Sequence, residues 1–156
     1  MSKKSRDKGS RGEREAAAFL TEHTGFQWVR GLPQTRRGGK ESPDIEPANE
    51  QCFWNKFHFE VKRIASRVDL NAAMLQASSD ARSRNKVPVV LWRADRNPWR
   101  ITIRANDFIF YSVFAQLLVR DEIELDGFQE FDEFGSSLIT LLADAWIGLV
   151  DVNRET

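Results

Sequence analysis

Two acidic residues and a lysine are spaced so that they can act together on a phosphate. Pro43-Asp44 comes first, and Phe59-Glu60-Val61-Lys62 follows it after a polar turn. If Asp44 begins one strand and Glu60 lies on its neighbour, their carboxylates can converge on one hard cation such as Mg²⁺. Such a cation lowers the pKa of a bound water and stabilises the charge that develops at a scissile phosphate. Lys62 shares the strand face of Glu60 and can orient the attacking water. The pattern favours metal-dependent hydrolysis of a phosphodiester.

The simpler alternative is a strand that carries Glu and Lys on a solvated face, since short patterns of this kind are common. The context favours the chemical interpretation. The motif falls on a predicted hairpin, which follows a predicted helix and a basic loop, as a nuclease site requires.

The elements before this motif are predicted from turn and capping signals. Ser10 with Glu13 forms a capping-box pattern, which alone would explain Glu13, and Gly25 is a stop signal, so we expect a helix over about 11–23. Residues 1–9 are basic and lack an apolar period, which indicates a flexible arm. A short strand over 26–30 ends at Gly31, and residues 32–42 form an exposed, mobile loop.

The elements around and after the motif give the order α-β-β-β-α-β-β. A strand at 44–46 and a return strand over 53–62 form the hairpin, with Phe57, Phe59 and Val61 facing the core and His58, Glu60 and Lys62 facing away from it. Asp69 caps a helix that ends near Arg84, and residues 87–93 and 99–105 are strands. Two apolar stretches in residues 106–156 have helical length. The prediction is an α/β fold with a mixed central sheet flanked by helices, composed of the arm at 1–9, a core at 10–105 and an acidic, mainly helical extension of the same domain at 106–156.

Charge is distributed unevenly along the 156 residues, although the formal net charge is zero. Residues 1–105 contain 21 Lys and Arg against 12 Asp and Glu, a balance of +9, and residues 106–156 carry the opposite balance of −9. A basic body favours a polyanionic partner such as DNA, because Lys and Arg displace the counterions condensed on phosphates. The acidic end could bind a partner protein or cover the basic cleft until DNA displaces it.

Composition excludes several other classes of protein. About two-fifths of the residues are hydrophobic, as is usual for a globular domain. The single cysteine, Cys52, excludes an internal disulfide, and the presence of only two histidines argues against a histidine-dominated zinc site. No apolar run has membrane-spanning length, so we expect a cytoplasmic protein without a membrane partner.

The first ordered residues show a more specific resemblance. Lys8-Gly9-Ser10-Arg11-Gly12-Glu13-Arg14 resembles the KGS-x-x-ER opening of the archaeal Holliday-junction resolvases. Val29-Arg30 with Pro33 and Thr35, then Pro43-Asp44-Ile45 and Glu60-Val61-Lys62, follow in the family's order, so the likeness covers roughly residues 7–105. Thr35 stands where the family usually has Ser, and the last fifty or so residues have no counterpart in it.

The resemblance implies a PD-(D/E)XK nuclease fold and a homodimer that cuts four-way DNA junctions with Mg²⁺, for which Mn²⁺ would substitute, in DNA recombination and repair. It implies metal ligands at Glu13, Asp44, Glu60 and the backbone carbonyl of Val61, with Lys62 as the residue that positions water. Arg30 or Arg14 would bind phosphate. The full set of DNA-binding candidates is Lys8, Arg11, Arg14, Arg30, Thr35, Arg36, Arg37 and Lys40.

Other residues receive structural interpretations. Gln76 could reach the site from its helix, but an exposed glutamine is the simpler view. Glu15 and His58 are expected to be solvated, His23 interacts favourably with the end of its helix, and the five dispersed tryptophans are assigned to core or partly buried positions.

Three functions stay open. The first is a structure-selective endonuclease, and the second is a nuclease of the same chemistry that acts on duplex, nicked or single-stranded DNA in restriction, repair or processing. The third is a DNA-binding module without catalysis, which the presence of Asp44, Glu60 and Lys62 together argues against.

Overall fold

The computed structural model describes residues 3–31, 42–65, 67–111, 127–129 and 137–152. Within these ranges the helices are α1 (Lys3–Thr24), the short 3₁₀ helix η2 (Phe53–Lys56), α2 (Leu70–Arg82), α3 (Ala105–Tyr111) and α5 (Ala143–Val152). The strands are β1 (Trp28–Arg30), β2 (Ile45–Pro47), β3 (Phe57–Ile64), β4 (Val87–Ala94), β5 (Arg100–Arg104), β6 (Gly127–Gln129) and β7 (Leu138–Leu142).

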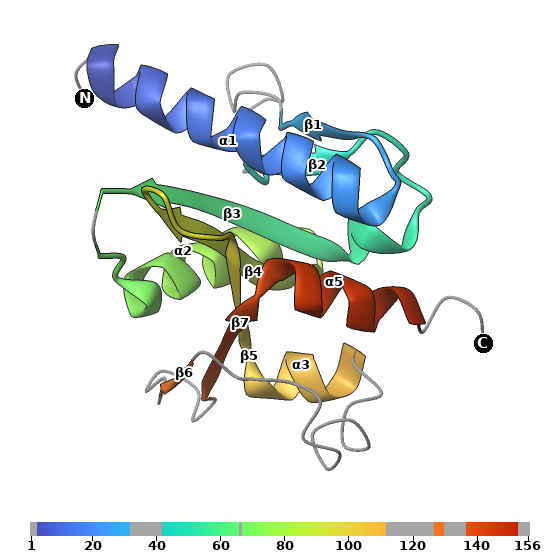
Figure 1. Ribbon diagram of the computed structural model, residues 1–156. Coiled ribbons are helices and arrows are strands. Elements are labelled where there is room, and N and C mark those ends of the chain that lie inside the picture. Colours follow the sequence, from blue (N-terminus) through green and yellow to red (C-terminus); the bar gives the residue numbers. More distant parts are fainter. Residues whose placement is uncertain (1–2, 32–41, 66, 112–126, 130–136, 153–156) are drawn as a thin grey trace.

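All described strands belong to one sheet in the order β1-β2-β3-β4-β5-β7-β6. The central pair β3 and β4 is parallel, with α2 as the crossover between its strands, and the other pairs are antiparallel. Helices α1 and α5 contact each other along one face, and α2 packs on the other (Figure 1). The predicted α/β class, with a mixed sheet flanked by helices, is confirmed.

The core on the α1 side is built from the alternating residues of the central strands. Phe57 and Phe59 are buried on this side of β3, as predicted, and both rings pack against Trp146 of α5. Four of the five tryptophans are buried and the fifth, Trp92, is partly buried, which confirms their assignment to the core. The buried tryptophans are Trp28, Trp54, Trp99 and Trp146.

The first helix begins earlier than the sequence predicts. It starts at Lys3, so residues 3–9 of the expected flexible arm are helical and Ser10 is not a cap. Lys and Arg are good helix formers, and they allow α1 to continue beyond the part that packs on the sheet. The predicted end is confirmed, because Gly25 has a φ of 69° and its N–H donates to the carbonyl of Thr21.

Two other segments also differ from prediction. Residues 53–56 form η2, so the return strand of the hairpin begins only at Phe57. Residues 138–142 form strand β7 instead of part of a helix, because this run pairs along the whole of β5 and extends the sheet. The C-terminal extension therefore adds strands as well as helix. By contrast, Asp69 is the predicted N-cap of α2, and its Oδ1 accepts a hydrogen bond of 3.0 Å from the N–H of Ala72.

No helix in the described part of the chain has both the length and the apolar character that crossing a bilayer requires.

Candidate metal and DNA site

Asp44 and Glu60 meet where β2 diverges from β3. Ile45 is the residue of β2 that pairs with β3, opposite Phe59, and the N–H of Asp44 donates to the carbonyl of Phe59 at 3.0 Å. The next hydrogen bond between the two segments involves the Asp44 side chain instead of its backbone. Its Oδ2 accepts a hydrogen bond of 2.7 Å from the N–H of Val61. This bond fixes the carboxylate against the Glu60-Val61-Lys62 segment.

A close backbone approach also holds Asp44 in place. The N–H of Gly31, just after β1, donates to the carbonyl of Asp44 at 2.9 Å. A Cβ at Gly31 would lie 1.9 Å from the carbonyl oxygen of Pro43. Only glycine leaves room for the chain to pass at this point.

The electrostatics of Asp44 indicate a cation site. Burial, followed by the charges of Glu60 and Glu13, raises the pKa of Asp44 from 3.8 to about 7, although the hydrogen bond from Val61 and the charge of Lys62 act to lower it. A bound cation would stabilise the ionised form of Asp44, and carboxylate oxygens are the ligands that Mg²⁺ and Mn²⁺ prefer. The donor set therefore fits a hard divalent cation.

Lys62 lies beside Glu60 as the two-residue spacing predicts. Its Nζ donates to Oε1 of Glu60 at 2.6 Å and to Oε1 of Gln76 at 3.2 Å. Gln76 is exposed on α2, and its contact with Lys62 places it next to the site. The sequence had favoured the simpler view that Gln76 is an exposed residue without a role in the site. The contact follows from the packing of α2 across the polar side of β3.

Glu13 approaches the site from α1, but its direct partner is a cation. Its Oε2 accepts a hydrogen bond of 2.5 Å from Arg30 Nε, and the Nη2 of Arg30 also reaches Ser10 Oγ at 3.2 Å. The predicted capping box is wrong, because Ser10 and Glu13 both lie inside α1. Glu13 nonetheless contributes to the raised pKa of Asp44, so its charge acts on the same site.

Two of the predicted DNA-binding arginines border one groove. Arg14 of α1 and Arg30 of β1 lie along a groove of about 610 Å³ between these elements, with Trp28 and Val29 in its wall. Arg11 is exposed on α1 and is paired with Glu15 at 2.9 Å. Lys8 is on α1, and the remaining candidates, Thr35, Arg36, Arg37 and Lys40, lie outside the described residues, as does the mobility predicted for their loop.

Glu15 is not the solvated residue that the sequence predicts. Besides Arg11, its Oε2 binds Arg93 at 2.5 Å and Arg63 at 3.1 Å, which ties α1 to strands β3 and β4. Burial acts to raise the pKa of Glu15, but the hydrogen bonds from Arg11 and Arg93 and the charge of Arg63 outweigh it and lower the pKa. Arg63 and Arg93 are distant from Glu15 in sequence, so no local pattern indicated that α1 would be tied to these strands.

His58 is also misassigned by the sequence, because its ring is fully buried. It shares the polar side of β3 with Glu60, and α2 covers that side. Burial, followed by the charges of Lys86 and Arg84, lowers its pKa to about 4. His23 at the end of α1 is exposed, and its Nδ1 lies 2.9 Å from the carbonyl of Phe19.

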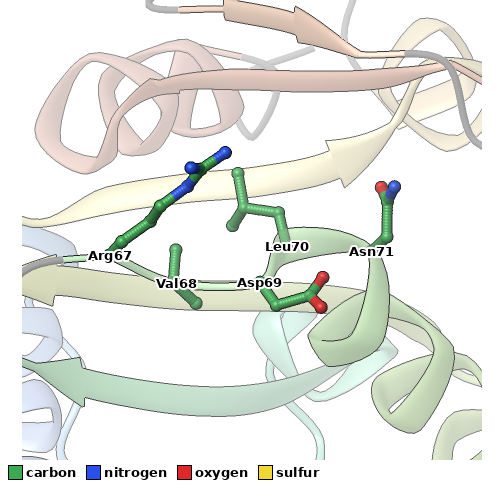
Figure 2. Close-up of a pocket in the computed structure, with 5 residues that line it drawn as sticks. All are labelled: Arg67, Val68, Asp69, Leu70 and Asn71. Carbon is green, nitrogen blue, oxygen red and sulfur yellow. The ribbon is translucent and has the colours of Figure 1, made fainter.

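The hollow in Figure 2 is separate from these carboxylates. It has a volume of about 430 Å³ and is lined by the connection from β3 to α2, residues 67–71. The acidic side chain in its lining, Asp69, already caps α2.

Comparison with known proteins gives one family and two individual similarities. A family model described as "Phage putative PDDEXK endonuclease" matches residues 4–151. Protein D14 of Escherichia phage T5 is 29% identical over 121 residues, which cover 69% of this chain and 75% of D14. Hjc of Archaeoglobus fulgidus, a Holliday junction resolvase from an archaeal hyperthermophile, has 14% sequence identity and a TM-score of 0.39, with coverage of 89% of this chain and 87% of that one.

Proposed function

This chain belongs to the phage PDDEXK endonuclease family, and from that premise we propose that it is a divalent-metal-dependent DNA endonuclease with Asp44, Glu60 and Lys62 at its active centre. The observation that carries the proposal is the convergence of these three side chains at one point of the sheet. Asp44 is held by the N–H of Val61, and Lys62 is held on Glu60.

The carboxylates of Asp44 and Glu60 would hold the metal, with the Val61 carbonyl and Glu13 as the further ligands proposed from the sequence. When bound, Mg²⁺ or Mn²⁺ supplies charge neutralisation at the scissile phosphate and a bound water of lowered pKa. Lys62 keeps Glu60 oriented and presents its ammonium group beside the phosphate. Gln76 positions Lys62 through the hydrogen bond to its Nζ.

Glu13 has a second proposed task, which is to hold Arg30 at the edge of the site. Arg30 is exposed, borders the groove next to β1 and carries a guanidinium that suits phosphate oxygens. The pair would thus place a phosphate-binding cation near the metal ligands.

Replacing Glu13 by Gln distinguishes these tasks. We expect the Mg²⁺ concentration for half-maximal cleavage to rise about tenfold or more, since loss of even an outer partner of a metal costs that much. The free energy of unfolding should change by about 1 kcal/mol or less, because the Glu13–Arg30 pair is partly exposed. The measurement is cleavage rate against Mg²⁺ concentration, with Glu50→Gln, an exposed carboxylate in the turn after β2, as the control. If the Mg²⁺ requirement is unchanged, Glu13 is not a metal ligand and serves only to hold Arg30.

We further propose branched DNA, in particular a four-way junction, as the substrate. The support is the order of sequence motifs over residues 7–105 and the basic balance of residues 1–105. A panel of labelled four-way junction, flap, nicked duplex, plain duplex and single strand, each with Mg²⁺, tests this directly. Preference for the junction supports the proposal, whereas preference for another DNA at equal metal would favour a restriction, repair or processing nuclease. If the protein binds these DNAs but cleaves none of them, the result would favour a DNA-binding module without catalysis.

A junction substrate has a consequence for assembly. A four-way junction presents two symmetry-related strands, and paired cuts are most simply made by two active sites in a twofold dimer. We therefore expect a homodimer, measured by light scattering with and without junction DNA. A monomer under both conditions would argue against junction cleavage while leaving the nuclease chemistry intact.

The basic loop before Asp44 is expected to bind the DNA backbone. Replacing Arg36, Arg37 and Lys40 together by Ala should weaken binding to all DNA sequences and make its salt dependence shallower, because fewer counterions are released. The slope of log affinity against log salt should decrease by about 2–3. Titrations at several salt concentrations measure both quantities. An unchanged affinity and slope would exclude this loop from the interface.

A further inference from the structure

His58 is a buried polar side chain whose imidazole ring is not accounted for by the described part of the chain. Its ring is 0% exposed, and within the described residues neither Nδ1 nor Nε2 has a hydrogen-bond partner. A buried polar group that is left without a partner costs about 1–3 kcal/mol. A ligand that accepts the lone pair of the imidazole would remove that penalty.

Two carboxylates surround the same space. The ligand atoms of His58, Glu60 and Asp80 all lie within 4.8 Å of one another. Asp80 lies on α2, four residues after Gln76, so the helix that reaches Lys62 also brings Asp80 to His58. Oxygen and nitrogen ligands bind one Zn²⁺ at about 2.0–2.2 Å, which puts them roughly 3–4 Å apart. The three residues can therefore surround a cation with only a small contraction.

We propose that His58, Glu60 and Asp80 form a second cation site, beneath α2, which takes a transition-metal ion such as Zn²⁺. An imidazole nitrogen suits Zn²⁺, whereas Mg²⁺ prefers oxygen ligands alone. This separates the site chemically from the carboxylate pair Asp44 and Glu60. Glu60 belongs to both, because its two oxygens can serve two neighbouring cations.

Sharing Glu60 gives the second site a means to affect the first. A cation at His58 competes with Lys62 for the Glu60 carboxylate, whose Oε1 now accepts from Lys62 Nζ at 2.6 Å. Zn²⁺ would thus alter the geometry of the catalytic pair. This consequence rests on the proposed function, but the site itself does not.

The experiment uses the fact that the chain has two histidines. The full-length ¹⁵N-labelled protein, freed of metal by chelation, is titrated with Zn²⁺ while the ring nitrogens of both histidines are followed by NMR. One equivalent should shift one ring nitrogen of His58 and leave exposed His23 unchanged, and Mg²⁺ should move neither. Unmoved His58 nitrogens in the folded protein would overturn the site. A shift of both histidines together, or an equal response to Mg²⁺, would also overturn it.

Variants separate this site from the catalytic pair. Asp80→Asn should weaken Zn²⁺ binding at least about tenfold, as the loss of a supporting carboxylate does in other metal sites. Asp44→Asn should leave Zn²⁺ binding intact, and calorimetry measures both, with circular dichroism as the check on folding. If Asp44→Asn abolishes Zn²⁺ binding and Asp80→Asn does not, Zn²⁺ occupies the Asp44–Glu60 pair. The second site is then wrong while the proposed nuclease stands.

Discussion

Replacing Asp44 by Asn should lower the rate of Mg²⁺-dependent DNA cleavage at least about a hundredfold, comparable to the loss of a principal electrostatic contact in other active sites. The amide is nearly the same shape and its oxygen can still accept the hydrogen bond from Val61, but it removes the charge that the metal requires. DNA affinity should change little, since the basic groove is untouched. Cleavage and binding are measured separately, by single-turnover rates and by titration in Ca²⁺ or without metal.

The same variant should be more stable than the wild type when metal is absent. The pKa of Asp44 is raised from 3.8 to about 7 in the folded protein, so its ionisation opposes folding. Below about pH 4 the carboxyl is neutral in both states and carries no penalty; the penalty grows as pH rises and is complete above about pH 7. The free energy of unfolding of Asp44→Asn should therefore be higher than that of the wild type by roughly 4 kcal/mol at about pH 8, with little difference near pH 4.

Denaturant unfolding at several pH values measures this difference in the free energy of unfolding. Mg²⁺ should reduce the difference, because it binds and stabilises only the wild type. Glu50→Gln, an exposed carboxylate in the turn after β2, is the matched control and should change neither cleavage nor the pH dependence. A variant at Asp44 that cuts at the wild-type rate would remove this residue from the site.

Gly31→Ala is expected to have the largest effect on stability. The new Cβ would lie 1.9 Å from the Pro43 carbonyl oxygen, which is a backbone atom that cannot rotate away. The strand connection must move instead, and with it the hydrogen bond from Gly31 to Asp44. Overpacking of this kind costs about 1–3 kcal/mol or more. Cleavage should fall as well, because the displaced segment carries Asp44.

Gly148→Ala provides the control for this substitution. Gly148 lies on the exposed part of α5, and among the described residues no atom other than those of its chain neighbours and of its own helix backbone lies within 4 Å of an added Cβ. Alanine in a helix interior is about 1 kcal/mol more favourable than glycine, so this variant should be more stable than the wild type. Thermal unfolding of the two variants measures the contrast. A Gly31→Ala protein as stable as the wild type would show that the approach of Gly31 to Pro43 is not a constraint on the fold.

Local patterns in the sequence determined the part of the site that depends on strand periodicity. Side chains alternate along a strand, so the order of residues 57–62 alone puts Phe57 and Phe59 in the core and Glu60 and Lys62 together on the opposite side. The end of α1 at Gly25 and the N-cap of α2 at Asp69 were equally local, since each depends on one residue and its near neighbours.

Where a segment can form more than one structure, the tertiary fold decides. Residues 138–142 are apolar and short, so periodicity does not distinguish a buried strand from the start of a helix. These residues form a strand because the edge of β5 provides hydrogen-bond partners along the whole segment. The start of α1 was undetermined for the opposite reason. The basic residues at its start have good helix propensity, but the sequence there has no apolar period that would mark where the helix must begin.

The environments of individual polar residues were decided only by tertiary structure. Glu15 is held by Arg63 and Arg93, which lie on two later strands, and His58 is buried because α2 crosses the polar side of β3. The same crossing joins Gln76 to Lys62. Periodicity states which way a side chain points, but its burial and charge depend on elements that return to it from elsewhere in the chain.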